Sequence, residues 1–255
     1  MRHPSFIGRS FMELTKYKYQ VEPSDQTALL PQPDLTDPAE PGCQLFDLPD
    51  PHQTGVPTVD LFKAINDRVS VRAYSNTPLS LGELSFLLWC TQGIKQTSDR
   101  PATLRTVPSA GSRHPFETYL LVNKVEGLQP GLYKYAALEH KLALISADAL
   151  LSENLTDACH RQGMVKNSAV TFFWVAVVYR TYWRYQERGY RYFHLDAGHI
   201  CQNLYLAVEP IGAGCCGIAA FDDEKLSAVL GIDGEQRIPV YLATVGKKSA
   251  SQHDG

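Results

Sequence analysis

The chain has no long apolar run and no large excess of charge of either sign. Its longest apolar stretch, residues 169–179, is shorter than the about 20 residues that a membrane-spanning helix needs. Residues 1–20 contain no continuous apolar segment of the kind found in secretory signal peptides. The formal net charge is −3, which argues against nucleic-acid binding by bulk electrostatic attraction. We therefore expect a cytoplasmic protein that binds neither membrane nor nucleic acid.

Spaced cysteine and histidine motifs are also missing. The six cysteines are scattered, apart from the adjacent Cys215 and Cys216, and free thiols in a reducing compartment are the simplest interpretation. His194 and His199 are five residues apart rather than four, and no acidic or cysteine partner stands at a useful spacing. We therefore expect no metal site.

The chain divides by composition into an arm and a domain. Apolar residues make up 44% of the sequence, enough for a substantial core. Nine of the 16 prolines lie at or before Pro57, and residues 1–56 show no apolar period. This segment is expected to be an extended arm without a core of its own, which either wraps over the domain or a partner subunit or is disordered. A domain over residues 57–248 and a tail over 249–255 complete the division.

Helical and strand patterns alternate irregularly within the domain. Helical periodicity covers residues 58–67, 80–90, 147–160, 194–212 and 222–232. Strand patterns cover residues 117–125, a hairpin at 131–146, and residues 169–179, 217–221 and 238–246. The pattern lacks a regular βαβ repeat, so it predicts an α+β fold with a helix-flanked mixed sheet.

Local signals mark two helix starts. Ser80 and Glu83 are spaced as a capping box, and Asp222 is a candidate N-cap for a helix that stops at Gly231. The apolar residues expected to face inward on the first two helices are Leu61, Ala64, Ile65, Leu84, Leu87 and Leu88.

The stretch "GAGCCG" at residues 212–217 fits the G-x-G-x-x-G pattern of dinucleotide-binding sites. That site needs a strand before the glycines and a helix directly after them. Here a predicted helix precedes and a predicted strand follows, so the order is inverted. The glycines are more consistent with close backbone approach to a flat ligand or a neighbouring strand.

Two basic segments are candidate phosphate sites. In "RVSVRAY" alternate side chains of an extended chain would place Arg68, Ser70 and Arg72 on one face. Two guanidinium groups and a hydroxyl suit a phosphate, although a solvated edge strand fits the spacing equally well. Lys247 and Lys248 follow the last predicted strand and gain meaning only if the same phosphate lies nearby.

The stretch "YRTYWRYQERGYRYFH" interleaves arginines with aromatic residues. Arg180, Arg184 and Arg188 recur at helical spacing. An aromatic lid over a planar cofactor or substrate is the preferred interpretation. A plain surface helix remains open, and base stacking on nucleic acid is disfavoured by the acidic chain.

The stretch "PSAGSRHPF" places Ser109 and Ser112 near His114, as in a nucleophile with its base. The G-x-S-x-G elbow is missing, and nothing marks an orienting acid downstream. A loop that cradles a ligand is therefore preferred over a hydrolase site.

In order along the chain, these segments resemble the FMN-dependent nitroreductase superfamily, and most nearly its SagB-type dehydrogenase branch, which oxidises azolines in peptide biosynthesis. The resemblance covers residues 58–248. It is carried by "RVSVRAY", "LSLGELSFLLWCTQGI", "RTVPSAGSRHPFETYL", "GYRYFHLDAGHICQNLYLAV" and "GCCGIAAFDDEKLSAVLGI".

The resemblance implies a set of site residues. Arg68, Ser70 and Arg72 would hold the ribityl chain and phosphate of FMN, with Lys247 or Lys248 as further partners. A loop matching Pro108, Ser109, Ala110 and Ser112 would reach the flavin of the other subunit, which implies an entwined homodimer. Backbone groups at Ala219 and Ala220 would approach flavin N5.

The resemblance also implies an activity. An FMN-dependent oxidoreductase would run a ping-pong cycle, in which NADH or NADPH delivers hydride to N5 and a planar acceptor such as a nitroaromatic or quinone then replaces it. Azoline oxidation with Tyr185 assisting is the alternative, and a non-catalytic flavin-binding module is the third. The azoline-oxidising branch tends to carry Lys-Tyr where this chain has Arg184-Tyr185, and an arginine cannot act as a base.

Overall fold

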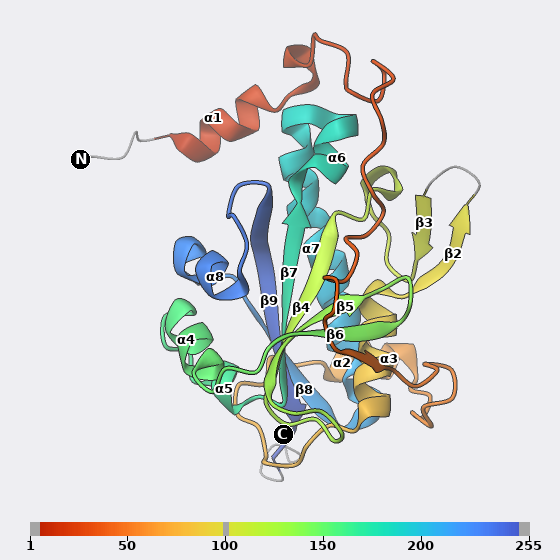
Figure 1. The fold of residues 1–255 in the computed structure, drawn as a ribbon, viewed down its shortest axis with the longest axis vertical. Helices are drawn as coiled ribbons and strands as arrows, with labels where there is room; N and C mark the ends of the chain where they lie inside the picture. Colours follow the sequence, from red (N-terminus) through yellow and green to blue (C-terminus); the bar gives the residue numbers. More distant parts are fainter. Residues whose placement is uncertain (1–5, 99–101, 250–255) are drawn as a thin grey trace.

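A computed structural model describes residues 6–98 and 102–249 (Figure 1). Its centre is a seven-stranded sheet in the order β1-β6-β5-β4-β7-β9-β8. The six pairings between these strands are antiparallel, and parallel contacts are isolated bridges such as Ser70–Cys215. The strands are β1 Leu45–Asp47, β4 Phe116–Val122, β5 Gly131–Ala136, β6 Lys141–Ser146, β7 Val170–Val177, β8 Ala213–Ile218 and β9 Arg237–Lys247. The predicted α+β class is confirmed.

Helices cover both faces of this sheet. One face carries α3 (Leu81–Gln92) and α7 (Gly189–Ala207), and the other carries α4 (Leu151–Ala158), α5 (Met164–Asn167) and α8 (Asp223–Leu230). Alternate residues of β7 enter the two cores: Phe172 and Trp174 pack on one side, Phe173 and Val175 on the other. Burial on both faces explains why this strand reads as a continuous apolar run.

The predicted helix caps are confirmed. Ser80 and Glu83 form the complete capping box of α3, and the Asp222 side chain accepts a hydrogen bond from the Lys225 amide at the start of α8. Gly231 ends α8 in the left-handed conformation with φ +70°. These are local signals, so sequence alone suffices to find them.

The prediction for α2 (Leu61–Asp67) was wrong in part. Ala64 is buried, but Leu61 and Ile65 are 64% and 54% exposed rather than inward, and Phe62 is 79% exposed. The helix shows an apolar side that this single chain leaves uncovered.

Two further segments differ from expectation. Residues 68–74 form no regular strand and touch the sheet through isolated bridges at Ser70 and Tyr74. The strand predicted at 217–221 is β8, which starts at Ala213 and contains most of the "GAGCCG" stretch. A Cβ on Gly214 would overlap Val71, and one on Gly217 would overlap Tyr241, so these glycines do admit close neighbours.

The aromatic-arginine segment is not one helix. Helix α6 (Val178–Tyr185) ends at a kink, a turn of 3-10 helix η3 (Gln186–Arg188) follows, and α7 begins at Gly189. Gln186 has φ +48° and ψ −141°, a conformation that side-chain-bearing residues rarely adopt. Arg180 and Arg184 therefore lie on α6, whereas Arg188 lies beyond the kink.

The N-terminal arm lies against the domain. It carries α1 (Ile7–Leu14), η1 (Tyr17–Tyr19) and β1, which adds to the sheet beside β6 (Figure 1). From Thr15 to residue 56 the arm wraps over the domain, whereas α1 projects away from it and has no buried residue (Figure 1). The division into arm, domain and tail stays a prediction, and most of the tail, residues 250–255, lies outside the described residues.

A small second sheet was not predicted. Strands β2 (Ile94–Ser98) and β3 (Ala102–Arg105) pair antiparallel between α3 and the "PSAGSRHPF" loop. That loop includes η2 (Ala110–Ser112). A fourth 3-10 turn, η4 (Glu209–Ile211), follows α7. Within the described ranges, no helix is long and apolar enough to cross a membrane.

Candidate functional site

The loop at residues 108–112 is anchored on α7 by a buried carboxylate. Asp196 accepts a hydrogen bond from the Ser109 hydroxyl at 2.5 Å and one from the Ala110 amide at 3.2 Å. Burial raises the pKa of Asp196, and these two donors oppose that rise. The loop is thus fixed to the middle of α7 with its backbone turned tightly at Gly111, φ +58°.

These contacts are incompatible with a serine nucleophile at Ser109. Its hydroxyl proton points to Asp196, and its oxygen accepts the backbone amide of His114 at 2.9 Å. The His114 ring is buried, and burial together with Arg105 and Arg113 lowers its pKa to about 3. No hydrogen bond joins the His114 ring to Ser109 or Ser112 within the described residues. The geometry fits the preferred interpretation of a ligand loop.

Tyr185 and Arg184 lie against the same loop. A Cβ on Gly111 would overlap the Tyr185 hydroxyl and come within 3.2 Å of Arg184 Cδ. The Tyr185 ring meets that of Tyr192 edge to face, with centroids 4.8 Å apart, and the Arg184 guanidinium is 5.4 Å from the Tyr185 ring centroid. The structure therefore brings Tyr185 and Arg184, the two residues that the resemblance marks as catalytic candidates, to the predicted loop.

The Arg68, Ser70 and Arg72 segment forms a separate group around Tyr205. The Arg68 guanidinium lies 5.2 Å from the Tyr205 ring centroid, and the hydroxyls of Ser70 and Tyr205 are 3.0 Å apart. The Tyr205 hydroxyl also accepts the amide of Gly217 at 2.8 Å. Ser70 and Arg72 are exposed, and no ion pair engages Arg68 or Arg72 among residues 6–98 and 102–249. These side chains are therefore available to an anion.

The two C-terminal lysines are already engaged. Lys247 pairs with Glu83 at 2.5 Å and donates to the Ile211 carbonyl at 2.7 Å, and Lys248 pairs with Glu209 at 2.9 Å. A phosphate bound by either lysine would have to share the lysine's ammonium group with a carboxylate. Ala219 and Ala220 directly follow β8 and are exposed.

Helix α7 sets the relation between the two groups. Asp196 anchors the loop and Tyr205 anchors the arginine segment, nine residues further along. At 1.5 Å and about 100° per residue, the two anchors are about 13 Å apart along the helix axis and about half a turn apart around it. Within one chain, the groups therefore face opposite sides of α7.

Three residues important to this arrangement were missed by the sequence reasoning. Asp196 and Tyr205 lie in a helix that was read as mostly buried, and Gly111 lies in a loop singled out for its serines. An acid in a mostly apolar helical stretch, with His199 three residues further on, was the available signal for Asp196. No signal in the sequence pairs Gly111 with Tyr185. Over the described ranges, no group of three or more His, Cys, Asp or Glu side chains is arranged to hold a metal ion.

The sheet, the long helix and its two anchored groups define a nitroreductase-type α+β protein. The chain belongs to the nitroreductase family, whose model matches residues 65–247. It is 35% identical over 181 residues to "Putative nitroreductase MJ1384" of Methanocaldococcus jannaschii, covering 71% of this chain and 87% of that protein.

Two other relatives extend the comparison. The chain is 29% identical over 133 residues to the trifolitoxin-processing protein TfxB of Rhizobium leguminosarum bv. trifolii, covering 51% of this chain and 36% of TfxB. A solved structure from Anabaena variabilis, which carries the same nitroreductase designation as MJ1384, superposes with a TM-score of 0.68 at 29% identity. That match covers 82% of this chain and 42% of the Anabaena chain. The chain therefore spans less than half of each of these two proteins.

Proposed function

We propose that the protein is an FMN-dependent oxidoreductase whose flavin phosphate is bound by Arg68, Ser70 and Arg72. The observation that carries this proposal is a pair of guanidinium groups on the same segment as the Ser70 hydroxyl, those of half-buried Arg68 and exposed Arg72, which form no ion pair within the described residues. Guanidinium groups bind phosphate oxygens through paired hydrogen bonds. The half-buried Tyr205 contacts the Arg68 guanidinium with its ring and the Ser70 hydroxyl with its own hydroxyl, and so fixes this segment against α7.

FMN would supply the two-electron hydride chemistry, with NADH or NADPH as reductant and a planar nitroaromatic or quinone as acceptor. The exposed backbone at Ala219 and Ala220 would border the ring system. The loop of Pro108, Ser109, Ala110 and Ser112 would close the site, held in place by Asp196. Tyr185 would line the acceptor side, and the positive charge of Arg184 beside it would favour an acceptor that carries negative charge or gains it on reduction.

We propose further that two copies of the chain share each site. The loop and the arginine segment face opposite sides of α7, so one copy would contribute them to two different sites. The exposed apolar side chains of α2 and α7 supply a surface for association; they are Leu61, Phe62, Ile65 and Leu195. Burying such side chains contributes about 25 cal/mol per Å².

Absorbance spectroscopy of the purified protein tests the proposal directly. Absorbance bands at roughly 370 and 450 nm mark bound flavin, and their loss on anaerobic addition of NADH or NADPH marks reduction of the flavin. Reoxidation by menadione would then complete a turnover. A colourless protein that takes up no added FMN would refute the proposal, and a yellow protein that neither reductant bleaches would favour a non-catalytic flavin-binding module.

Oxidation of an azoline or related heterocycle in a peptide-derived product is the second candidate. The similarity to a trifolitoxin-processing protein favours it. Tyr185 would be the remaining proton-transfer group, because Arg184 keeps its proton at any working pH. Anaerobic bleaching of the flavin by a thiazoline-containing peptide, but not by NADH, would select this reaction over the first.

A further inference from the structure

A segment of the N-terminal arm follows the predicted catalytic region closely. Residues 15–37, called the strap below, run along α6, the kink at η3 and the start of α7 (Figure 1). At one end, Arg188 donates to the Thr15 carbonyl at 3.0 Å and Arg191 donates to the Thr15 hydroxyl at 2.6 Å. The Arg188 guanidinium also lies 4.1 Å from the Tyr17 ring centroid. None of these contacts is needed to complete the sheet.

The strap makes its most specific contacts at the kink. Gln20 donates from Nε2 to the backbone carbonyl of Tyr185 at 2.6 Å. The next residue, Gln186, donates from its own side chain to the carbonyls of Glu22 and Pro23, at 3.3 and 3.2 Å. A side-chain-bearing residue at φ +48° and ψ −141° is strained and persists only where its surroundings impose that conformation. Here the strap supplies those surroundings.

Two further hydrogen bonds fix the last turn of α6. The Gln26 amide donates to the Trp183 carbonyl at 2.9 Å, and Trp183 Nε1 donates to the Leu30 carbonyl at 3.1 Å. Residues 183, 185 and 186 are thus each bonded to the strap. Between them stands Arg184, whose side chain, with that of Tyr185, lies against Gly111.

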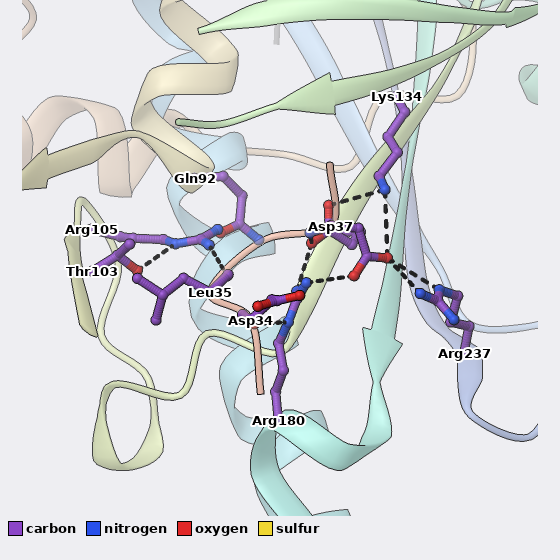
Figure 2. A network of polar contacts seen from close by, with 10 residues as sticks. Asp34, Leu35, Asp37, Gln92, Thr103, Arg105, Lys134, Arg180 and Arg237 are labelled. Carbon is purple, nitrogen blue, oxygen red and sulfur yellow. Dashed lines mark hydrogen bonds and ion pairs between the residues drawn. The ribbon is translucent and has the colours of Figure 1, made fainter. Parts of the chain in front are cut away.

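The other end of the strap is held by a buried charge cluster, shown in Figure 2. Arg180 is 2% exposed and donates to Asp37 at 2.8 Å, to Glu117 at 2.6 Å and to the Asp34 carbonyl at 2.9 Å. Arg237 and Lys134 also pair with Asp37, at 2.9 and 3.5 Å. The strap therefore cannot slide along α6 without breaking a buried ion pair, which is costly.

We propose that the strap is a built-in positioning element of the candidate site and that Gln20 is its positioning residue for Tyr185. Gln20 holds the Tyr185 carbonyl, the kink turns the chain there, and the Tyr185 hydroxyl stays against the loop at Gly111. The functional part rests on the proposed function, because Tyr185 acts in turnover only if a substrate binds beside it.

Hydrogen–deuterium exchange on the full chain without added flavin tests the physical part. Gln20→Glu preserves the side chain's shape but places an acceptor against the Tyr185 carbonyl. Because one hydrogen bond contributes about 1 kcal/mol, we expect exchange in residues 183–188 to quicken about fivefold. Gln20→Ala should do the same more mildly. Wild-type exchange rates in both variants would overturn the proposal.

Tyr179→Phe is the matched control. It removes the hydrogen bond that the Tyr179 hydroxyl donates to Asp25 of the strap at 2.9 Å. Tyr179 lies on the same helix, six residues before Tyr185. We expect this variant to leave exchange at 183–188 unchanged. An equal acceleration in this variant would mean that any loosening of the arm loosens α6, and would overturn the role of Gln20.

Kinetics with menadione tests the functional part. In Gln20→Glu we expect the KM for menadione to rise about fivefold. The FMN content, measured from the absorbance at roughly 450 nm, should stay at the wild-type level. An unchanged KM in the flavin-loaded variant would overturn the positioning role. A wild type that takes up no FMN would refute the proposed function instead, and exchange alone would then decide whether the strap fixes the kink.

Discussion

The Tyr185 hydroxyl occupies the space that a Cβ on Gly111 would need. Gly111 also has φ +58°, where side chains are disfavoured. A residue from the end of α6 and a residue from the loop at 108–112 are therefore packed in van der Waals contact, although 74 positions separate them in the sequence. This contact joins the two parts of the candidate site that the sequence analysis treated separately.

Gly111→Ala should lower the free energy of unfolding by more than the cost of placing an alanine at a positive φ. Positive φ alone costs about 1 kcal/mol, and the overlap with Tyr185 adds to it. Gly127→Ala is the control, because Gly127 has φ +81° with open space around it. Urea unfolding should show a larger loss of stability for Gly111→Ala than for Gly127→Ala. Equal losses of stability in the two variants would mean that the Tyr185 hydroxyl does not pack closely against Gly111.

Asp37→Asn should destabilise the fold strongly. The change leaves Arg180 with one fewer anion in a buried site, and removing one partner of such a pair costs about 3 kcal/mol. Burial alone would raise the pKa of Asp37, but Arg180, Lys134 and Arg237 outweigh it and lower that pKa. Thermal unfolding measures the loss.

Asp47→Asn provides the comparison for Asp37. Asp47 pairs with Lys141 at 2.9 Å, but its side chain is 86% exposed. Exposed pairs contribute about 0–1 kcal/mol. If both substitutions lowered the melting temperature equally, the cluster around Asp37 would not hold the strap.

Stability should fall in mild acid because of His114. The folded-state pKa is lowered to about 3, below the ordinary value of about 6.5. Between those two pH values His114 binds a proton in the unfolded chain but not in the folded chain, which favours unfolding. The neutral, buried His114 therefore costs the fold no stability above pH 6.5, and the free energy of unfolding falls as the pH is lowered toward 3. At pH 5 the loss is about 2 kcal/mol. Urea unfolding at pH 7 and pH 5 should show it for the wild type.

His114→Asn isolates that contribution, since Asn tolerates the left-handed backbone at φ 43°. The variant should lose less stability than the wild type between pH 7 and pH 5. An identical loss in both proteins would place the acid sensitivity elsewhere.

Local signals were the predictable part of this fold. The capping box at Ser80 and Glu83 and the stop at Gly231 depend on neighbours within a few residues, and they were found. The inward assignment of Leu61 and Ile65 failed, because an apolar helix side indicates burial without saying which surface provides it. The φ of +48° that breaks the helix at Gln186 was equally invisible, since tertiary contacts impose it.

The sequence allowed most residues of the candidate site to be predicted, but it did not reveal the contacts that hold them in place. The resemblance pointed to Arg68, Ser70 and Arg72 and to the loop with Ser109. The anchors, Asp196 and Tyr205, act across separations of 87 and 135 residues. Contacts of that range follow from the packed fold and leave no periodic trace in the sequence.

Mixed dimers test whether each site is shared. One chain would carry Arg72→Ala and the other Gly111→Ala, and each homodimer should be impaired. In a mixed dimer with shared sites, one site combines the intact arginine of one chain with the intact loop of the other. Partial recovery of menadione reduction on mixing is expected, whereas no recovery would place both parts of a site on the same chain.

A fluorescence titration of the apoprotein with FMN tests whether FMN binds through the segment of Arg68, Ser70 and Arg72. Loss of a charge-assisted hydrogen bond of about 1.5–3 kcal/mol predicts that Arg72→Ala raises the Kd for FMN by a factor of about 10 to 150. Arg161→Ala, which removes a surface arginine paired with Asp157, should leave the Kd at the wild-type value. If Arg72→Ala also bound FMN as the wild type does, the account would be contradicted.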